Sequence, residues 1–265
     1  MEEDILQKHR EVWKKKKILR DIYEEWYRMI IADLSKVEGP TVELGAGSGN
    51  FKEFYPQAIS ADIEKRDWID MSFDAHEMPF DNSSVANIVK IDVLHHLADP
   101  VGFLHEASRV LKKGGRLIML EPFPSLFSRI VYKLFHPEPF IYDVDYFNHK
   151  PSMEKHPWDS NQAVAYLIFY KHLDKFVKVF GKTFKIVKKE KMSLILYPAS
   201  GGFENPSMIP ETLITIFKGI EKAVSPLSQF MAFRAYINIE KGLNWIPMCG
   251  KSSLKGMLNN FLTKI

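Results

Sequence analysis

A carboxylate and three alternating glycines lie close together near the start of the chain. Glu43 is followed by Gly45, Gly47 and Gly49 in the segment VELGAGSGN, which also completes a short apolar strand. Glycines at every second position let the backbone turn sharply and approach a ligand where a Cβ would collide. The pattern therefore predicts a nucleoside-binding turn at the end of a strand.

The residues of this turn distinguish two classes of ligand. A dinucleotide fold needs G-x-G-x-x-G to seat a pyrophosphate on a helix N-terminus, and Asn50 stands where the third glycine would be. A carboxylate at Glu43 would repel phosphate, whereas it could hold an ammonium group. A ligand with an amino acid tail and a sulfonium charge, such as S-adenosylmethionine, therefore suits this turn better than a pyrophosphate.

Acidic residues also lie near the ends of the next two predicted strands. Residues 58 to 63 (AISADI) form an apolar strand ending near Asp62, a position from which a carboxylate accepts both hydroxyls of a ribose. Residues 68 to 73 then lead to Asp74 and Ala75, which offer a carboxylate and backbone groups to an adenine edge. Both acids are therefore expected beside the glycine turn.

The remaining chain predicts four more strands and the helices between them. The fourth and fifth strands are expected at 85 to 91 and 116 to 121, with Gly114 and Gly115 closing the intervening helix. A helix at about 161 to 180, a strand at about 183 to 193 and a last strand at 233 to 240 complete the pattern.

Taken in order, the segments VELGAGSGN, SADI, FDAHEMPF, VLHHLADP and RVLKKGGRLIMLEP resemble the successive motifs of class I S-adenosylmethionine-dependent methyltransferases. The likeness is closest to the small-molecule branch that includes the ubiquinone/menaquinone C-methyltransferases, and it covers residues 38 to 122. It implies a Rossmann-like, doubly wound α/β fold. The sheet would have seven mostly parallel strands with an antiparallel last strand, and insertions after strands 5 and 6.

The resemblance implies S-adenosylmethionine as cofactor and S-adenosylhomocysteine as product. Carried over residue by residue, it implies cofactor contacts from Glu43, Gly45, Ala46, Gly47, Asn50, Asp62, Ile63, Asp74, Ala75, His76 and Ile91. One departure is the short spacing between the glycine turn and the next two strands. A parallel crossover usually needs about a dozen residues or more, so the first two crossover helices must be stunted and other segments must cover that face.

A single methyltransferase domain is expected over residues 1–265. Residues 1–37 read as an N-terminal helical cap that can fold over the ligand, and 38–122 as the cofactor-binding core. Residues 122–160, rich in proline and aromatic residues, and residues 197–231 are read as substrate-side insertions. The second insertion includes an amphipathic helix at 211 to 224, for which packing on the core is favoured over binding to membrane or lipid.

Catalytic residues are less clearly marked than the cofactor turn. Methyl transfer from a sulfonium needs mainly orientation and exclusion of water, and a base is required only if the acceptor must lose a proton. The candidate bases are His95, His96 and His149, and the candidate substrate contacts are Tyr146, His149 and His156. No metal site is expected.

Composition narrows the class of partner. The 36 basic and 33 acidic residues are too balanced to indicate nucleic acid. Cys249 is the sole cysteine, so an internal disulfide is excluded and a cytoplasmic setting is expected. No apolar run is long enough to span a bilayer, which leaves only peripheral membrane contact open. The oligomeric state is left open.

The favoured function is methyl transfer to an oxygen or carbon of a small-molecule acceptor, with an apolar part suggested by the aromatic insertions. One alternative is a non-catalytic protein that senses S-adenosylmethionine or holds a partner. Another is a nicotinamide-dependent oxidoreductase on the related fold, which would bind NAD instead. Turnover separates the first alternative from the favoured function, and cofactor choice separates the second.

Overall fold

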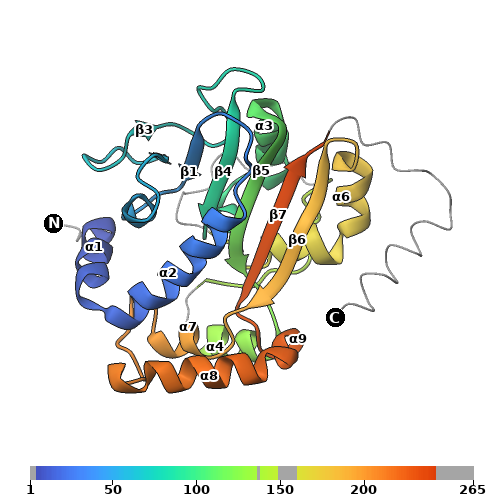
Figure 1. The fold of residues 1–265 in the computed structure, drawn as a ribbon. Helices are drawn as coiled ribbons and strands as arrows, with labels where there is room; N and C mark the ends of the chain where they lie inside the picture. The colour runs from blue at the N-terminus through green and yellow to red at the C-terminus, as the bar shows by residue number, and fades with distance from the viewer. Residues whose placement is uncertain (1–3, 136–137, 149–159, 243–265) are drawn as a thin grey trace.

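The computed structural model describes residues 4–135, 138–148 and 160–242, and its centre is one seven-stranded sheet (Figure 1). The strand order is β3-β2-β1-β4-β5-β7-β6. The strands are β1 (Thr41–Leu44), β2 (Ile59–Asp62), β3 (Met71–Ser72), β4 (Val85–Ile91), β5 (Leu111–Pro122), β6 (Phe184–Met192) and β7 (Arg234–Lys241).

The pairing confirms the predicted fold class. β1, β2, β3, β4 and β5 pair in parallel, and β7 lies antiparallel between β5 and β6. The chain reverses beside β1, because β2 and β3 extend to one side and β4 to the other. In open α/β sheets, ligands bind outside the carboxyl ends of the strands at such a switch point, so the glycine turn after β1 lies where a ligand is expected.

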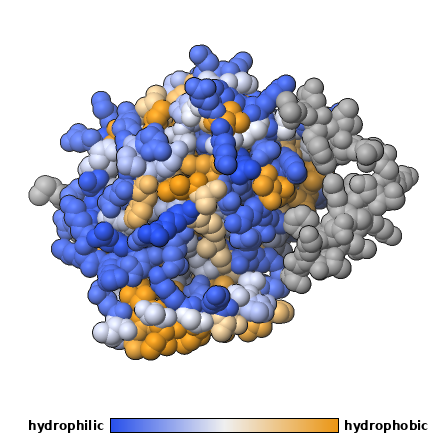
Figure 2. All heavy atoms as spheres, viewed as in Figure 1, coloured by the Kyte–Doolittle hydropathy of each residue, from blue (hydrophilic) through white to orange (hydrophobic). Residues whose placement is uncertain are grey.

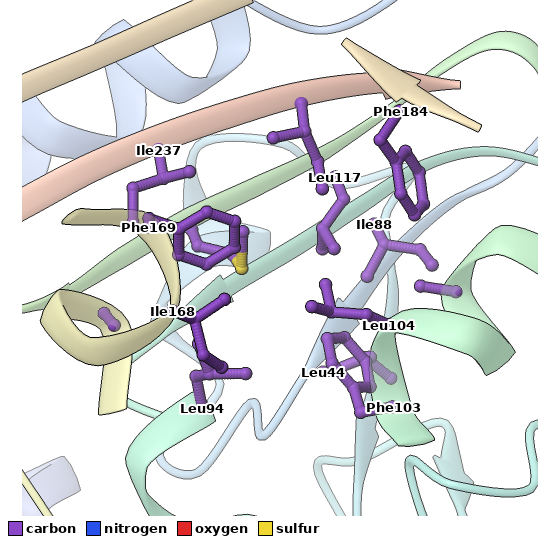
Figure 3. Close-up of a cluster of buried hydrophobic side chains, with 14 of the residues drawn as sticks. Leu44, Ile88, Leu94, Phe103, Leu104, Leu117, Ile168, Phe169, Phe184 and Ile237 are labelled. Atoms are coloured by element: carbon purple, nitrogen blue, oxygen red, sulfur yellow. The ribbon is translucent and has the colours of Figure 1, made fainter. Parts of the chain in front are cut away.

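One face of the sheet packs against helices that follow β4 and the first insertion. These are α3 (Pro100–Val110), α5 (Val164–Tyr166), the π-helical turn η3 (Leu167–Lys171) and α6 (Leu173–Phe180). Figure 3 shows Leu44, Ile88, Leu117 and Ile237 from the sheet meeting side chains such as Phe169 from these helices. Every residue labelled in Figure 3 is buried. They belong to the larger of the two apolar clusters that pack on the sheet.

The other face is covered largely by the N-terminal helices α1 (Ile5–Lys15) and α2 (Lys17–Ala32). As expected from the short spacing, the first crossover holds only the 3₁₀ turn η1 (Asn50–Glu53). The ring of Tyr27 in α2 packs against the rings of Phe51 and Phe54 in this crossover, with centroids 5.3 and 5.2 Å apart. An element outside the βαβ core therefore fills the layer that a full crossover helix would occupy.

Two insertions follow β5 and β6, as predicted. The first carries α4 (Leu126–Phe135), and the second carries α7 (Leu196–Ser200), η4 (Glu211–Leu213), α8 (Ile214–Val224), η5 (Ser225–Leu227) and α9 (Ser228–Met231). Figure 1 shows α4, α7, α8 and α9 gathered at one end of the sheet. Among the described residues, no helix is long and apolar enough to cross a membrane.

Two features of the predicted helices were wrong. Gly114 and Gly115 do not close a helix, because α3 ends at Val110 and Leu111 already pairs with Val85 at the start of β5. The helix expected over 161 to 180 is interrupted by the π-helical turn η3.

Candidate functional site

The turn after β1 has the backbone that its glycines predict. Gly45, Gly47 and Gly49 have φ angles of 64°, 51° and 76°, in the left-handed region that favours glycine. A Cβ on Gly45 would lie 2.3 Å from Cγ2 of Val93, which follows β4. The first glycine is therefore required both by its backbone conformation and by the close approach of a neighbouring segment.

Glu43 is a buried carboxylate beside this turn. Its side-chain Oε2 has no hydrogen-bond partner among the residues that the structure describes. Burial, reinforced by the nearby charge of Asp62, raises its pKa to about 8. A cation placed against Glu43 would relieve both penalties, so the position fits a ligand ammonium group.

Asp62 at the end of β2 connects that strand to the glycine turn. Its Oδ2 accepts a hydrogen bond from the Gly47 amide at 2.8 Å, and its Oδ1 accepts one from the Glu64 amide at 3.1 Å. These two donors hold the carboxylate at the carboxyl edge of the sheet. A carboxylate oxygen accepts more than one hydrogen bond, so ribose hydroxyls can be added to this arrangement.

Asp74 and His76 form the third part of this edge. Asp74 Oδ1 accepts from the His76 amide at 2.8 Å and lies 2.6 Å from His76 Nδ1. Partial burial opposes ionisation of Asp74, but the hydrogen bonds and charge of His76 lower its pKa overall. His76 Nε2 lies 3.0 Å from the Asp99 carbonyl oxygen, so the pair also spans the gap to the segment before α3.

These groups surround one cavity of about 1200 Å³. The structure brings all eleven predicted cofactor residues to its wall: Glu43, Gly45, Ala46, Gly47, Asn50, Asp62, Ile63, Asp74, Ala75, His76 and Ile91. The two N-terminal helices contribute as well, with Ile5, Leu6, Lys8 and His9 from α1 and Tyr23 and Tyr27 from α2. The volume exceeds what one nucleoside needs, and the extra space extends toward the insertions.

His95 lies on this cavity wall and is held by a buried carboxylate that sequence reasoning did not assign. Glu121 of β5 accepts hydrogen bonds from His95 Nδ1 at 2.7 Å and from the Leu94 amide at 2.7 Å. Burial would raise the pKa of Glu121, but these bonds and the charges of His95 and Lys90 lower it to about 2. An ionised Glu121 only accepts, so Nδ1 carries a proton and Nε2 is the ring nitrogen that can act as a base. Nε2 lies 3.9 Å from Glu138 Oε2.

Lys90 completes the charge balance behind the histidine. Its Nζ lies 3.9 Å from Glu121 Oε1 and 4.3 Å from the centre of the Phe103 ring, and the side chain is fully buried. Burial lowers the pKa of Lys90 to about 7, against the raising effect of Glu121. Lys90 therefore helps to keep Glu121 ionised inside an apolar layer, and Glu121 in turn orients His95.

The insertion side of the cavity contains a second ion pair that the sequence did not indicate. Arg234 at the start of β7 donates to Asp92 Oδ1 and to the hydroxyl of Tyr197. Its guanidinium lies 4.3 Å from the centre of the Tyr197 ring. Asp92 has a φ of 56°, a strained conformation for a residue with a side chain. Asp92, Tyr197 and Arg234 all line the cavity.

Among the described residues, no predicted substrate residue lines the cavity. Both insertions do reach it, through residues that include Tyr132, Glu138 and Tyr197. Tyr146 is not among the lining residues, because its ring packs against the core and its hydroxyl accepts from Asn161 Nδ2 at 3.0 Å. His149 and His156 lie outside the described residues.

Two groups of potential metal ligands share His95. His95, His96 and Glu138 form one, and Asp92, His95 and Glu121 form the other, each with ligand atoms within 4.8 Å of one another. In the second group the His95–Glu121 hydrogen bond already joins two of the three members. The expectation of no metal site stays a prediction.

Comparison with known proteins agrees with this geometry. Residues 42–119 match the family model described as a methyltransferase domain, which spans less than a third of the chain. The matched region contains the glycine turn, Asp62, Asp74 and His95. The match identifies residues 42–119 as a methyltransferase domain, and S-adenosylmethionine is the cofactor that the residues around the glycine turn fit.

Individual relatives are distant or short. An uncharacterized 37.1 kDa transposon protein of Streptomyces fradiae is 47% identical over 49 residues, which are 18% of this chain and 14% of that protein. The structure is similar to a SAM-dependent methyltransferase from Archaeoglobus fulgidus, with a TM-score of 0.48, 16% identity and coverage of 86% and 97% of the two chains. It is also similar to the YcgJ protein from Bacillus subtilis, with a TM-score of 0.44, 15% identity and coverage of 81% and 96%.

The raised pKa of Glu43 predicts a proton release on cofactor binding. At pH 7 a carboxyl group with a pKa of about 8 is mostly protonated, and an ammonium partner would favour its ionised form. Binding of S-adenosylmethionine at pH 7 is therefore expected to release about one proton. Calorimetric titration in buffers of different ionisation enthalpy measures this number directly.

A matched pair of variants assigns the proton. Glu43→Gln should abolish the release, whereas Glu64→Gln, another acid on the cavity wall, should retain it. An unchanged release in Glu43→Gln would contradict the assignment.

The same raised pKa implies that, without ligand, Glu43 lowers the free energy of unfolding as pH rises from 4.5 to about 8.

Proposed function

We propose that this methyltransferase acts on an oxygen or a carbon of a small-molecule acceptor that has an apolar part. The observation that carries the proposal is the His95–Glu121 pair on the wall of the cofactor cavity. A hydroxyl or a carbon acid must lose a proton as it is methylated, and such acceptors need a base of this kind. The proposal agrees with the resemblance to the small-molecule branch that includes the ubiquinone/menaquinone C-methyltransferases.

In this proposal each of the three acidic residues binds a different part of the cofactor. Glu43 takes the ammonium group, Asp62 accepts the ribose hydroxyls, and Asp74 with Ala75 contacts the adenine. The unpartnered Oε2 of Glu43 and the two amides that hold Asp62 support the first two assignments. Gly45, Ala46, Gly47, Asn50, Ile63, His76 and Ile91 complete the wall.

When bound, S-adenosylmethionine supplies a methyl group already activated by its sulfonium. The protein's contribution is then orientation of the acceptor, exclusion of water and removal of one proton. Nε2 of His95 takes the proton from the acceptor's hydroxyl or acidic carbon, and the ionised Glu121 stabilises the resulting imidazolium through Nδ1. The proton later passes to solvent, which returns His95 to its neutral form.

The rest of the cavity supports an acceptor with both polar and apolar parts. Tyr23, Val131 and Phe233 offer apolar surface on the insertion side, and Arg234 and Gln162 offer hydrogen-bond donors. Most ligand pockets combine a largely apolar wall with a few placed polar groups, and this wall has that character.

The test separates cofactor choice from turnover. Calorimetric titration with S-adenosylmethionine, S-adenosylhomocysteine and NAD should show binding of the first two and not of NAD. A panel of phenols, enolisable carbonyl compounds and primary amines is then assayed for S-adenosylhomocysteine formation. Turnover with phenols or enolisable carbonyl compounds supports the proposal, and turnover confined to amines would overturn the acceptor assignment.

A further inference from the structure

The insertion helices expose apolar side chains on the side that faces away from the sheet. The residues concerned are named here the outer apolar face and come from α4, the η4–α8–η5 segment and α9: Leu126, Phe127, Ile130, Leu134, Leu213, Ile216, Ile220, Leu227 and Phe230. Their exposed fractions run from 38% for Leu213 to 68% for Leu134. Figure 2 shows hydrophobic residues along the edge where Figure 1 draws α8 and α9.

The helix α8 has one broad apolar stripe, and only part of it is buried. Ile214 is buried and Phe217 packs against the core, whereas Ile216 and Ile220 are 58% and 41% exposed. The expectation that this stripe packs on the core therefore holds for Ile214 and Phe217 and not for Ile216 and Ile220. Large apolar side chains left exposed along the edge of such a stripe are suited to contact with another apolar phase.

The helix α4 also exposes apolar side chains, and its inner side lines the cofactor cavity. Leu126, Ile130 and Leu134 are exposed on its outer side, while Val131 and Tyr132 line the cofactor cavity. A single helix layer thus separates the outer apolar face from the space where the acceptor is proposed to bind.

The charges around the outer apolar face are predominantly positive. Arg129 and Lys133 on α4 and Lys222 on α8 are exposed. The acid beside Lys222 is turned inward, since Glu221 accepts hydrogen bonds from the Leu194 and Leu196 amides at 2.9 and 2.8 Å. Lys218 is paired with Glu25, and Glu211 lies at the far end of the segment.

We propose that the outer apolar face docks on the surface of a bilayer that contains anionic lipids. Apolar helix faces bordered by lysine and arginine lie in the interface between headgroups and acyl chains, held by apolar burial and by attraction to anionic headgroups. A second copy of the chain fits less well, because a symmetric contact would bring the same cations toward one another. Docking would bring α4, and the cavity behind it, next to acceptors dissolved in the bilayer.

Vesicle binding tests the proposal on the full chain. The protein should co-sediment with vesicles of phosphatidylcholine mixed with phosphatidylglycerol, bind much less to phosphatidylcholine alone, and dissociate as salt rises. The double variant Ile216→Ser/Ile220→Ser should lose about tenfold or more in vesicle affinity. Val187→Ser on β6, which is 41% exposed and outside the face, should bind like the parent chain.

Two further measurements test the fold and the oligomeric state of the double variant. Affinity for S-adenosylmethionine in the double variant should match that of the parent, which shows that the fold and cofactor site are intact. Light scattering without lipid should give one mass for both. Equal vesicle binding by parent and double variant, or a parent dimer that the double variant dissociates, would overturn the proposal. Either result would leave the proposed methyl transfer untouched, because that is judged by turnover on soluble acceptors.

Discussion

Replacing His95 by asparagine is expected to lower the rate constant of methyl transfer by about 10²- to 10⁴-fold, the usual contribution of a positioned general base. The asparagine amide lies near the position of Nδ1, so it can still donate to Glu121 and leave that buried carboxylate satisfied. What the variant lacks is the basic Nε2. Affinity for S-adenosylmethionine should change little, because the contacts proposed for the cofactor come from other residues.

The rate is measured under single-turnover conditions across pH, with an acceptor found in the panel. The parent enzyme should show the full rate, and His95→Asn should show the reduced rate at each pH. His105→Gln provides the control, because that histidine packs against Phe180 and does not line the cavity. A His95→Asn rate equal to that of the parent would remove His95 as the base.

Glu121→Gln separates positioning from proton transfer. Its amide can still contact His95, but the charge that stabilises the imidazolium is gone, so the rate should fall although Nε2 of His95 is kept. An unchanged rate in Glu121→Gln would show that the carboxylate only packs beside the histidine.

The parts of the site that sequence reasoning located are local in the chain. The glycine turn, Glu43, Asp62 and Asp74 lie at, or within two residues of, the carboxyl end of a strand, so strand order alone brings them to one edge of the sheet. The fold class, and the residues that line the cavity at this edge, were therefore accessible from short motifs. Glu121 follows the same rule at the end of β5, and that signal could have identified it.

The parts that were missed depend on distant segments or on solvent exposure. Arg234 meets Asp92 only because β7 inserts between β5 and β6, and no local pattern marks its side chain as turned toward the cavity. The apolar stripe of α8 was recognised, but a stripe alone does not specify which side faces the core. Ile214 and Ile216 differ in burial because of how the whole segment docks on α2 and α7.

The Arg234–Asp92 pair predicts the largest stability change outside the core. Arg234→Met removes a guanidinium whose side chain is 4% exposed and leaves Asp92 charged beside apolar surface. Removing one partner of a fully buried pair costs about 3–5 kcal/mol. Because the Asp92 side chain is 27% exposed to the cavity, the free energy of unfolding should fall by less, about 2–3 kcal/mol at pH 7.

Chemical denaturation of the parent, the two single variants and Arg234→Met/Asp92→Asn measures the coupling. The double variant should recover part of the loss, because it no longer leaves an unpaired carboxylate. Burial already raises the pKa of Asp92, and loss of Arg234 raises it further. A group with a raised pKa in the folded state costs stability as pH increases, so the penalty of Arg234→Met should shrink toward acidic pH, where Asp92 takes up a proton. A penalty that is independent of pH and unchanged by Asp92→Asn would mean that Arg234 stabilises the fold through its packing on Tyr197 and Trp26 instead.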